Sequence, residues 1–325
     1  MSPHPPVITV LHGSDVPPDL APVRPLAAEV RAADGPAELA ELLPGTEVLF
    51  VWDFNSDALA EHWSRADRLR WVHTASAGVD RMMFPALVES EVLLTNSRGV
   101  FDQPMAEYVL GLLLAFAKDL PTTLQLQGRR RWRHRETRRL AGSHAVVVGT
   151  GPIGRAIGRL LTSAGVVVTG VGRRGRDSDP DLGRVHPSSE LAALLPDADH
   201  LVLAAPLTEA TRGLVGAREL AALGPEGVLV NVGRGPLVDQ RALEEAVVAG
   251  AIGGVALDVF EEEPLPAHSP LWSAPSVIVS PHMSGDVVGW RDELVELFGD
   301  NLRRVLGGQE PRNVVDKRLG YVSTT

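Results

Sequence analysis

Short runs of apolar residues alternate with segments of helical spacing along the first third of the chain. Four runs are rich enough in β-branched or aromatic residues to be strands, and they lie at 7–11, 47–52, 70–74 and 92–96. Between them, 37–43 and 57–63 repeat their apolar positions with the period of a helix. Because alternating strands and helices are typical of parallel sheets, this part predicts a small parallel α/β domain.

The alternation continues through the second half, where the apolar runs carry few polar residues and fit strands buried on both faces. They predict six parallel strands, the usual number in a doubly wound fold, at 145–148, 166–171, 200–205, 227–232, 253–260 and 276–280. Helices are predicted at 189–195 and at 239–250, where Gly250 is a C-cap. A long apolar helix at 104–120 precedes these strands, and an amphipathic helix at 290–306 follows them.

A glycine-rich turn, Gly149-Thr-Gly151-Pro-Ile-Gly154, joins the first of these six strands to an amphipathic segment. Gly149 permits a tight turn, Gly151 lets the backbone approach a pyrophosphate, and Gly154 lets the helix lie close to the strand. The positive end of the helix would then face the anion. Strand, glycine turn, helix and strand in this order predict a dinucleotide-binding site.

Composition narrows the classes of function. The chain has 325 residues, enough for two domains, with a net charge of −10 and no cysteine. The lack of cysteine excludes disulfides, thiolate zinc sites and thiol nucleophiles, and no metal site is predicted. No apolar stretch reaches the roughly 18 residues that span a bilayer, and the N-terminus does not resemble a signal peptide. We therefore expect a cytoplasmic protein without a membrane partner.

A basic run at 128–140 contains Trp132 and seven arginines at most a few residues apart. It is open to two interpretations: an anion-binding patch for nucleic acid, or a solvated arm or subunit contact. Because the protein as a whole is acidic, the second is favoured, and no nucleic-acid partner is predicted.

Polar side chains follow three of the predicted strands in the second half. Arg234 lies between two glycines that we expect to bring the backbone close to a ligand, an acidic run occupies 258–263, and His282 follows a proline. An arginine fork matches a carboxylate and can polarise a neighbouring carbonyl, and a histidine can donate a proton to a developing alkoxide. A carboxylate beside the second ring nitrogen stabilises the imidazolium. The set fits the chemistry of 2-oxo acids.

Five motifs carry a resemblance that covers essentially the whole chain: GTGPIG, PLTEATRGLV (206–215), VNVGRGPLVD (230–239), GVALDVFEEEPLP (254–266) and SPHMSG (280–285). In this order they closely resemble the D-isomer-specific 2-hydroxyacid dehydrogenases. The resemblance implies that Arg234 binds the substrate carboxylate and that His282 is the general acid and base. It also implies that Glu263, which immediately precedes Pro-Leu-Pro, is the partner of the histidine.

Further contacts are implied by the same resemblance. Ser76, Ala77, Gly78 and Val79 would form the substrate loop and offer backbone N–H groups to the carboxylate, although from spacing alone this stretch is equally a turn in which Asp80 caps the next helix. Asp258 would meet the nicotinamide end of the cofactor. The implied cofactor-binding residues are Gly149, Gly151, Pro152, Ile153, Gly154, Arg173, Arg174, Pro206, Thr211, Val232, Gly233, Asp258 and Gly285.

The implied architecture is α/β, with two Rossmann-like or flavodoxin-like parallel-sheet domains and the active site in the cleft between them. Residues 1–98 and 287–325 would form the substrate-binding domain, and 99–286 the dinucleotide-binding Rossmann domain. The helix at 104–120 and the basic arm would form a homodimer interface. Whether Trp132 or Trp290 reaches the substrate is left open.

The end of the predicted strand at 166–171, the second strand of the dinucleotide-binding motif, predicts the choice of cofactor. An NAD site places an acid about 20 residues after the glycines to hold the ribose hydroxyl. Here Arg173 and Arg174 follow Gly172, and no acid occurs before Asp177. Two guanidiniums suit a 2′-phosphate, so NADP(H) is predicted to be preferred, with NAD(H) possible. The alternative is that both arginines only solvate a loop.

Together these features predict NAD(P)H-dependent reduction of a small 2-oxo acid, such as glyoxylate or hydroxypyruvate, to the D-2-hydroxy acid. The pattern resembles the glyoxylate/hydroxypyruvate reductase branch of the family. Trp52, Phe54 and Trp290 are candidates for the outer wall of the pocket, but they do not identify the substrate. Two other hypotheses are open: a dehydrogenase-like NAD(P)-sensing interaction protein, and a relative that acts on another substrate such as phosphite.

Overall fold

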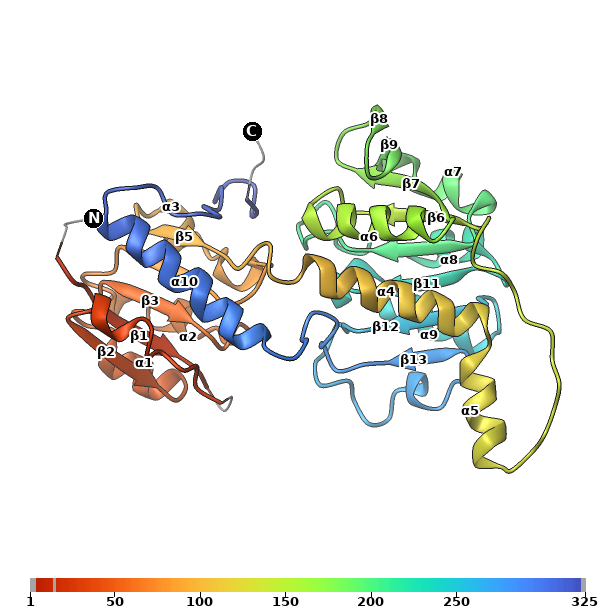
Figure 1. Ribbon diagram of the computed structural model, residues 1–325, viewed down its shortest axis with the longest axis horizontal. Coiled ribbons are helices and arrows are strands. Elements are labelled where there is room, and N and C mark those ends of the chain that lie inside the picture. The colour runs from red at the N-terminus through yellow and green to blue at the C-terminus, as the bar shows by residue number, and fades with distance from the viewer. Residues whose placement is uncertain (1–3, 14–15, 323–325) are drawn as a thin grey trace. The chain divides into compact units, whose positions relative to one another are not determined.

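The chain folds into two compact units, each with its own parallel sheet (Figure 1). The computed structural model describes residues 4–13 and 16–322. The first unit comprises Met1–Phe101 and Val287–Thr325, and the second comprises Asp102–Asp286. The first unit is therefore made from both ends of the chain, and the second is contiguous. The predicted α/β class with two parallel sheets is confirmed.

The first unit contains a five-stranded parallel sheet in the order β2-β1-β3-β4-β5. Its strands are β1 (Val7–Leu11), β2 (Glu29–Ala33), β3 (Val48–Val51), β4 (Trp71–Thr74) and β5 (Leu93–Thr95), and its helices are α1 (Pro36–Leu42), α2 (Ala58–Glu61), α3 (Pro85–Glu89) and α10 (Trp290–Leu306). Four of these strands match the predicted apolar runs. The strand β2 was not predicted, because this edge strand carries the charged residues Glu29 and Arg31 and buries only Ala33.

The core of the first unit has one layer on each face of its sheet. On one face, Leu39 of α1 and Leu87 of α3 pack against strand residues such as Leu49. On the other face, Phe298 of α10 stacks on Phe50 with ring centroids 4.4 Å apart. Successive strand residues point to opposite faces, and β1, β3, β4 and β5 bury residues on both, which explains their nearly continuous apolar runs.

The second unit contains an eight-stranded sheet in the order β13-β12-β11-β10-β6-β7-β9-β8. Its strands are β6 (His144–Val148), β7 (Val167–Gly172), β8 (Arg176–Asp179), β9 (Gly183–Pro187), β10 (His200–Leu203), β11 (Val228–Asn231), β12 (Gly254–Leu257) and β13 (Val277–Val279). The prediction of six strands was incomplete. It omitted β9, which pairs parallel to β7, and β8, which pairs antiparallel to β9.

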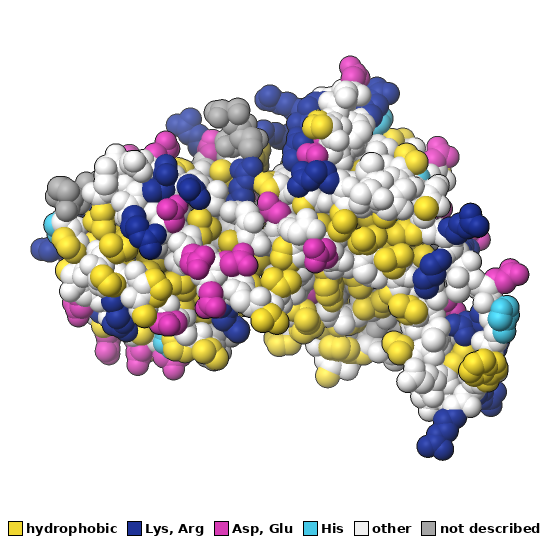
Figure 2. Space-filling model, in the orientation of Figure 1, with side chains coloured by type: hydrophobic (Ala, Val, Ile, Leu, Met, Phe, Trp, Pro, Cys, Tyr) yellow, Lys and Arg dark blue, Asp and Glu magenta, His cyan; other side chains and the backbone are white. Residues whose placement is uncertain are grey.

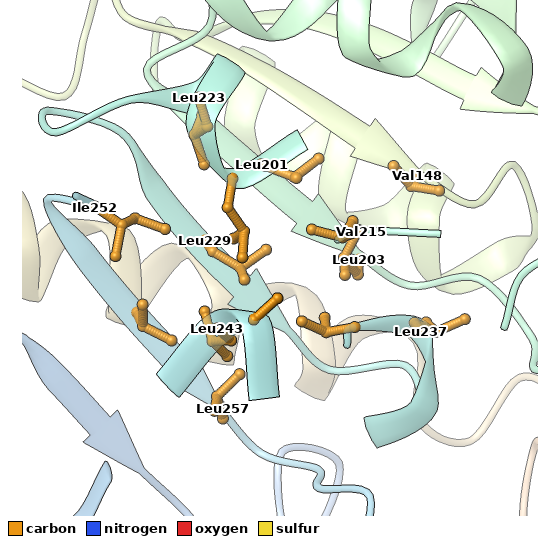
Figure 3. Packing of buried hydrophobic residues seen from close by; sticks show 14 of the residues in the cluster. Val148, Leu201, Leu203, Val215, Leu223, Leu229, Leu237, Leu243, Ile252 and Leu257 are labelled. Atoms are coloured by element: carbon orange, nitrogen blue, oxygen red, sulfur yellow. The ribbon is translucent and has the colours of Figure 1, made fainter. Parts of the chain in front are cut away.

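Helices cover both faces of the second sheet: α4 (Asp102–Ala117), α6 (Pro152–Ser163), α7 (Leu191–Leu194), α8 (Ala217–Leu223) and α9 (Gln240–Val248). A further helix, α5 (Leu120–Gly128), buries none of its residues. Figure 3 shows one core layer, in which Leu223 of α8 and Leu243 of α9 face Leu201 and Leu229 of the sheet. The alternate strand residues, such as Val202, face α4 and α6. These layers hold the carboxyl ends of the parallel strands in register.

The predicted helix at 104–120 corresponds to the first of two consecutive helices, α4, and the second, α5, was not predicted. The first ends at Ala117, Asp119 adopts a left-handed conformation with φ 48°, and the second leaves at an angle of 65°. Among the described residues, no single helix is long and apolar enough to cross a membrane, and this bent pair meets the criterion by length and composition only. The basic arm follows without regular structure, and Arg135 anchors it by donating to Asp119 at 2.7 Å.

Candidate active site

The glycine turn between β6 and α6 has a separate structural reason for each of its three glycines. Gly149 has φ +119°, and a Cβ there would lie 2.6 Å from the Ala204 oxygen. A Cβ on Gly154 would lie 1.8 Å from the Gly149 oxygen, so only glycine lets the helix pack on the turn. Gly151 is different, because a Cβ there would meet nothing within 4 Å. The space beside Gly151 is therefore open on the side where a ligand would approach.

The start of α6 fits the pyrophosphate of a dinucleotide. Pro152 is the first helical residue, and no acidic side chain lies in the first turn. The N–H groups of Ile153 and Gly154 precede the first intrahelical hydrogen bond, which Arg155 donates to the Gly151 oxygen. An uncovered helix N-terminus without a carboxylate favours an anion. Nearby, Thr211 donates to the Pro206 oxygen at 2.8 Å and so holds the loop after β10.

The end of β7 carries the two arginines predicted to select the cofactor. Gly172 packs against the glycine turn, since a Cβ on it would lie 2.8 Å from the Thr150 side chain. Arg173 and Arg174 follow directly and are both exposed. They therefore leave the sheet at its carboxyl edge, beside the turn that fits the pyrophosphate. No acidic residue intervenes before Asp177.

Arg234 follows β11 on a backbone that the neighbouring residues hold. The Asn231 side chain accepts from the Gly233 N–H at 3.1 Å and donates to the Arg234 carbonyl at 2.9 Å. The two glycines beside Arg234 make room for protein, and the expectation that they bring the backbone close to a ligand stays a prediction. A Cβ on Gly233 would lie 2.9 Å from the Ala205 oxygen, and one on Gly235 would overlap Phe260 at 1.9 Å.

His282 lies in a loop that Asp258 organises. Since β12 and β13 are parallel neighbours, Asp258 and Ser280 follow them at the same edge of the sheet. The buried Asp258 carboxylate accepts hydrogen bonds from the Ser280 hydroxyl at 2.7 Å and from the N–H groups of Met283 and Ser284, both at 2.9 Å. The His282 N–H donates to the Asp258 carbonyl at 2.8 Å. The predicted contact of Asp258 with nicotinamide stays a prediction.

The structure brings Glu263 and His282 together. Glu263 Oε2 lies 2.8 Å from His282 Nδ1, and Glu263 Oε1 accepts the Phe260 N–H at 3.0 Å. Burial alone would raise the pKa of Glu263, but the hydrogen bond and charge of His282, the Phe260 N–H and the charge of Arg234 bring the pKa below its usual value. An ionised Glu263 accepts a hydrogen bond from the Nδ1–H, which assigns proton exchange with a substrate to Nε2. In the same acidic run, Glu261 instead accepts from the Gln240 N–H.

In the first unit, the loop after β4 presents backbone donors. Its carbonyl groups are bound by protein: that of Ser76 accepts the Ser97 N–H at 3.0 Å, and that of Ala77 accepts Asn96 Nδ2 at 2.6 Å. Within the described part of the chain, the N–H groups of residues 76–79 have no protein acceptor. This is the arrangement expected of an anion-binding loop. Asp80 is the first residue of a short 3-10 helix and does not cap it through its side chain.

The aromatic candidates differ in their surroundings. Trp290 lies parallel to Trp52, with ring centroids 6.2 Å apart, and both belong to the first unit. Trp132 is fully exposed on the basic arm. The supporting residues were not predicted: they are Ser280, Asn231 and Asn96. Each stands at or just after the end of a strand, and that position is the signal that points to them.

Comparison with known proteins gives relatives over most of the chain. The family model described as D-isomer specific 2-hydroxyacid dehydrogenase, NAD binding domain, matches residues 110–284. Glyoxylate/hydroxypyruvate reductase B of Pectobacterium carotovorum subsp. carotovorum is 32% identical over 261 residues, which are 78% of this chain and 81% of that protein. Glyoxylate/hydroxypyruvate reductase A of Arabidopsis thaliana is 32% identical over 265 residues, 80% of this chain and 82% of that protein.

Solved structures of similar fold contain the phosphorylated cofactor. A D-isomer specific 2-hydroxyacid dehydrogenase from Xanthobacter autotrophicus Py2, in complex with NADPH and MES, has a TM-score of 0.83 and 30% identity, covering 98% of this chain and 100% of that one. An NADPH-dependent glyoxylate/hydroxypyruvate reductase from Sinorhizobium meliloti, in complex with NADP and sulfate, has a TM-score of 0.83 and 27% identity, covering 97% and 100%.

Proposed function

Because the chain belongs to the D-isomer specific 2-hydroxyacid dehydrogenase family, we propose that it reduces a small 2-oxo acid, such as glyoxylate or hydroxypyruvate, to the D-2-hydroxy acid. The family consists of NAD(P)-binding oxidoreductases, so the predicted family and enzyme class are confirmed. The observation that carries the proposed reaction is the 2.8 Å contact between His282 and Glu263. It holds an imidazole beside an ionised carboxylate, as a proton donor to an alkoxide requires.

In the proposed mechanism, Arg234 binds the substrate carboxylate with its planar fork and polarises the neighbouring carbonyl. His282 donates the proton on Nε2 to the oxygen as it becomes an alkoxide. Glu263 accepts the hydrogen bond from Nδ1 throughout, which keeps the ring oriented and offsets its positive charge. The backbone N–H groups of 76–79 are proposed to bind the carboxylate. A bound nicotinamide cofactor supplies the hydride.

The proposed cofactor is NADPH, with NADH as a weaker alternative. The support is the pair Arg173 and Arg174, both exposed at the end of β7, and the lack of an acid at that position. Relatives of known structure were crystallised with NADP or NADPH. The two guanidiniums would bind the 2′-phosphate, and the start of α6 would bind the pyrophosphate.

We also propose that the protein is a homodimer that covers the outer side of α4 and α5. Leu114, Leu120 and Leu124 are exposed large apolar residues on these helices. Figure 2 shows hydrophobic side chains gathered over this part of the second unit. An apolar surface of this kind commonly marks a contact between subunits.

The proposed reaction is tested by following NADPH absorbance with glyoxylate, hydroxypyruvate, pyruvate and phenylpyruvate, each repeated with NADH. We expect oxidation with at least one acid, and faster with NADPH. Tight NADPH binding without oxidation by any 2-oxo acid would contradict the proposal and favour a sensing protein. Reduction of NADP⁺ by phosphite or formate, without activity on 2-oxo acids, would identify another substrate class.

A further inference from the structure

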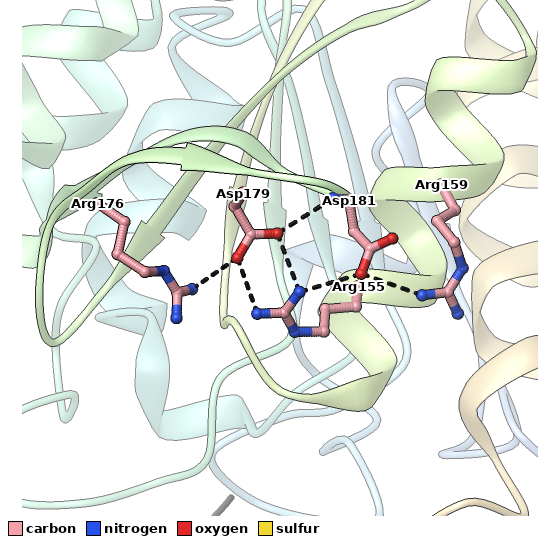
Figure 4. Close-up of polar contacts among 5 residues, drawn as sticks. All are labelled: Arg155, Arg159, Arg176, Asp179 and Asp181. Atoms are coloured by element: carbon pink, nitrogen blue, oxygen red, sulfur yellow. Dashed lines mark hydrogen bonds and ion pairs between the residues drawn. The ribbon is translucent and has the colours of Figure 1, made fainter. Parts of the chain in front are cut away.

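The hairpin β8–β9 is tied to the first turns of α6 by a cluster of ion pairs (Figure 4). Asp179 at the end of β8 is buried and receives Arg155 in a bidentate contact, at 2.9 Å and 2.8 Å. Arg155 also donates to Asp181 at 3.0 Å, and Arg159 lies 3.2 Å from Asp181 on the outer side. The helix whose N-terminus fits the pyrophosphate therefore also holds this hairpin.

The loop 173–175 is thereby anchored at both ends. Before it, Gly172 packs on Thr150 of the glycine turn. At the other end of the loop, its last residue, Gly175, lies against Pro187 of β9, where a Cβ would stand 3.4 Å from the proline ring. Arg176 then pairs with Asp179 at 3.0 Å. The two arginines proposed to bind the 2′-phosphate therefore lie on a short loop. One end of this loop packs on the glycine turn, and the other end joins the hairpin that α6 holds.

Asp179 also binds one of the three arginines of this segment, Arg176. Arg173, Arg174 and Arg176 lie within four residues, and three like charges so close repel one another. Because Arg176 is held by Asp179, its guanidinium is directed into the hairpin. Arg173 and Arg174 are the residues proposed to bind the 2′-phosphate.

A contribution to stability is not enough to explain why these ion pairs are present. Replacing a buried ion pair by well-packed apolar residues is often neutral or stabilising, and such pairs are better attested as devices that fix geometry. Here the geometry concerns a loop at the candidate cofactor site. We propose that the Arg155–Asp179 pair is a positioning element for cofactor selection, which holds Arg173 and Arg174 where they bind the 2′-phosphate of NADP(H). This inference rests on the proposed preference for NADP(H).

The test compares NADP⁺ and NAD⁺ binding by calorimetry, so that it does not depend on turnover. Asp179→Asn keeps the shape of the side chain and removes its charge. We expect the Kd of NADP⁺ to rise roughly tenfold, the effect of weakening about one charged hydrogen bond, while the Kd of NAD⁺ stays unchanged. Arg159→Gln is the matched control, since Arg159 contacts only the outer Asp181, and both Kd values should stay at the wild-type level.

Circular dichroism and thermal unfolding establish that each variant is folded. If Asp179→Asn does not fold, Arg155→Lys takes its place, because it keeps the charge and loses the bidentate fork. An equal rise in both Kd values, or no change in either, overturns the positioning role. Wild-type protein that binds NADP⁺ no better than NAD⁺ overturns the proposed cofactor preference, and the inference with it. The wild-type and variant measurements therefore distinguish the two failures.

Discussion

His282 holds a backbone conformation that ordinarily favours glycine or asparagine, with φ +53°. A non-glycine residue in such a region costs about 1–3 kcal/mol, which the surroundings must offset. Here the His282 N–H donates to the Asp258 carbonyl, and the next two N–H groups donate to the Asp258 carboxylate. The strained residue is therefore held at the position where its ring meets Glu263.

Replacing His282 by asparagine tests the proton donor without disturbing this backbone, since asparagine tolerates a positive φ. We expect kcat for 2-oxo acid reduction to fall by roughly 10²–10⁴-fold, as is typical when a general acid is lost. The Kd of NADPH should stay unchanged. His268→Asn, at an exposed position beyond the acidic run, serves as the control with wild-type kcat. A variant at His282 with undiminished kcat would remove it from the mechanism.

Among single residues, the sequence could identify Arg234, Glu263 and His282 as candidates, because each follows a strand and matches a family motif. It could not show that Asp258 binds the His282 loop, since the three donors come from residues 22 to 26 positions away. Pairs such as Arg155 with Asp179 were missed for the same reason. An ion pair across 24 positions has no local pattern.

At the scale of elements, strands buried on both faces could be predicted, and edge strands could not. The runs at 145–148 and 200–205 are apolar throughout, whereas β8 has the sequence RDSD and β9 the sequence GRVHP. These two strands are held by ion pairs and by pairing with β7, so apolar periodicity does not reveal them. Helix α5 was not predicted, because none of its residues is buried and its sequence LPTTLQLQG carries no apolar stripe that faces a core.

The start of α9 offers an element-scale prediction. Asp239 is its N-cap, and its side chain accepts the Ala242 N–H at 3.0 Å. Asp239→Ala leaves that donor without its acceptor and should lower the free energy of unfolding by about 1 kcal/mol. Asp239→Asn retains an accepting oxygen and should stay within a few tenths of the wild-type value. Urea denaturation followed by circular dichroism measures both, and equal losses would show that the cap bond contributes nothing.

At the scale of the whole molecule, one histidine is buried in the neutral form in the described part of each unit. Burial lowers the pKa of His73 to about 3 in the first unit, and burial, the largest cause, lowers the pKa of His200 to about 4 in the second. Each folded-state pKa lies below the unfolded value near 6.5. The contribution of each neutral histidine to the free energy of unfolding is therefore complete above pH 6.5 and is lost as the pH falls toward its folded-state pKa.

For His73 this loss amounts to about 2 kcal/mol at pH 5 relative to neutral pH. His73→Gln should make the melting temperature fall less steeply between pH 6.5 and pH 5 than it does in the wild type. The exposed position of His134 makes His134→Gln the control, with the wild-type slope. Differential scanning calorimetry across this range measures the slopes. Identical slopes for all three proteins would show that His73 is not the source of acid sensitivity.

The proposed dimer gives a second prediction at this scale. Leu124→Asp places a charge on the exposed apolar surface of α5 and should convert the dimer to a monomer at micromolar concentration. Val248→Asp, at an equally exposed apolar position on α9, should leave the assembly unchanged. Light scattering after size-exclusion chromatography measures the mass. A wild-type protein that elutes as a monomer contradicts the proposal directly.

The split of the first unit between the two ends of the chain has a consequence for biosynthesis. Phe50 and Trp71 lie on early strands, but Phe298, which covers both, is made only after the whole of Asp102–Asp286. At about 5–20 residues per second, translation leaves these two rings uncovered for on the order of ten seconds or more. The contiguous second unit can fold on the ribosome during that interval. The N-terminal sheet thus lacks its α10 cover until translation reaches the end of that helix.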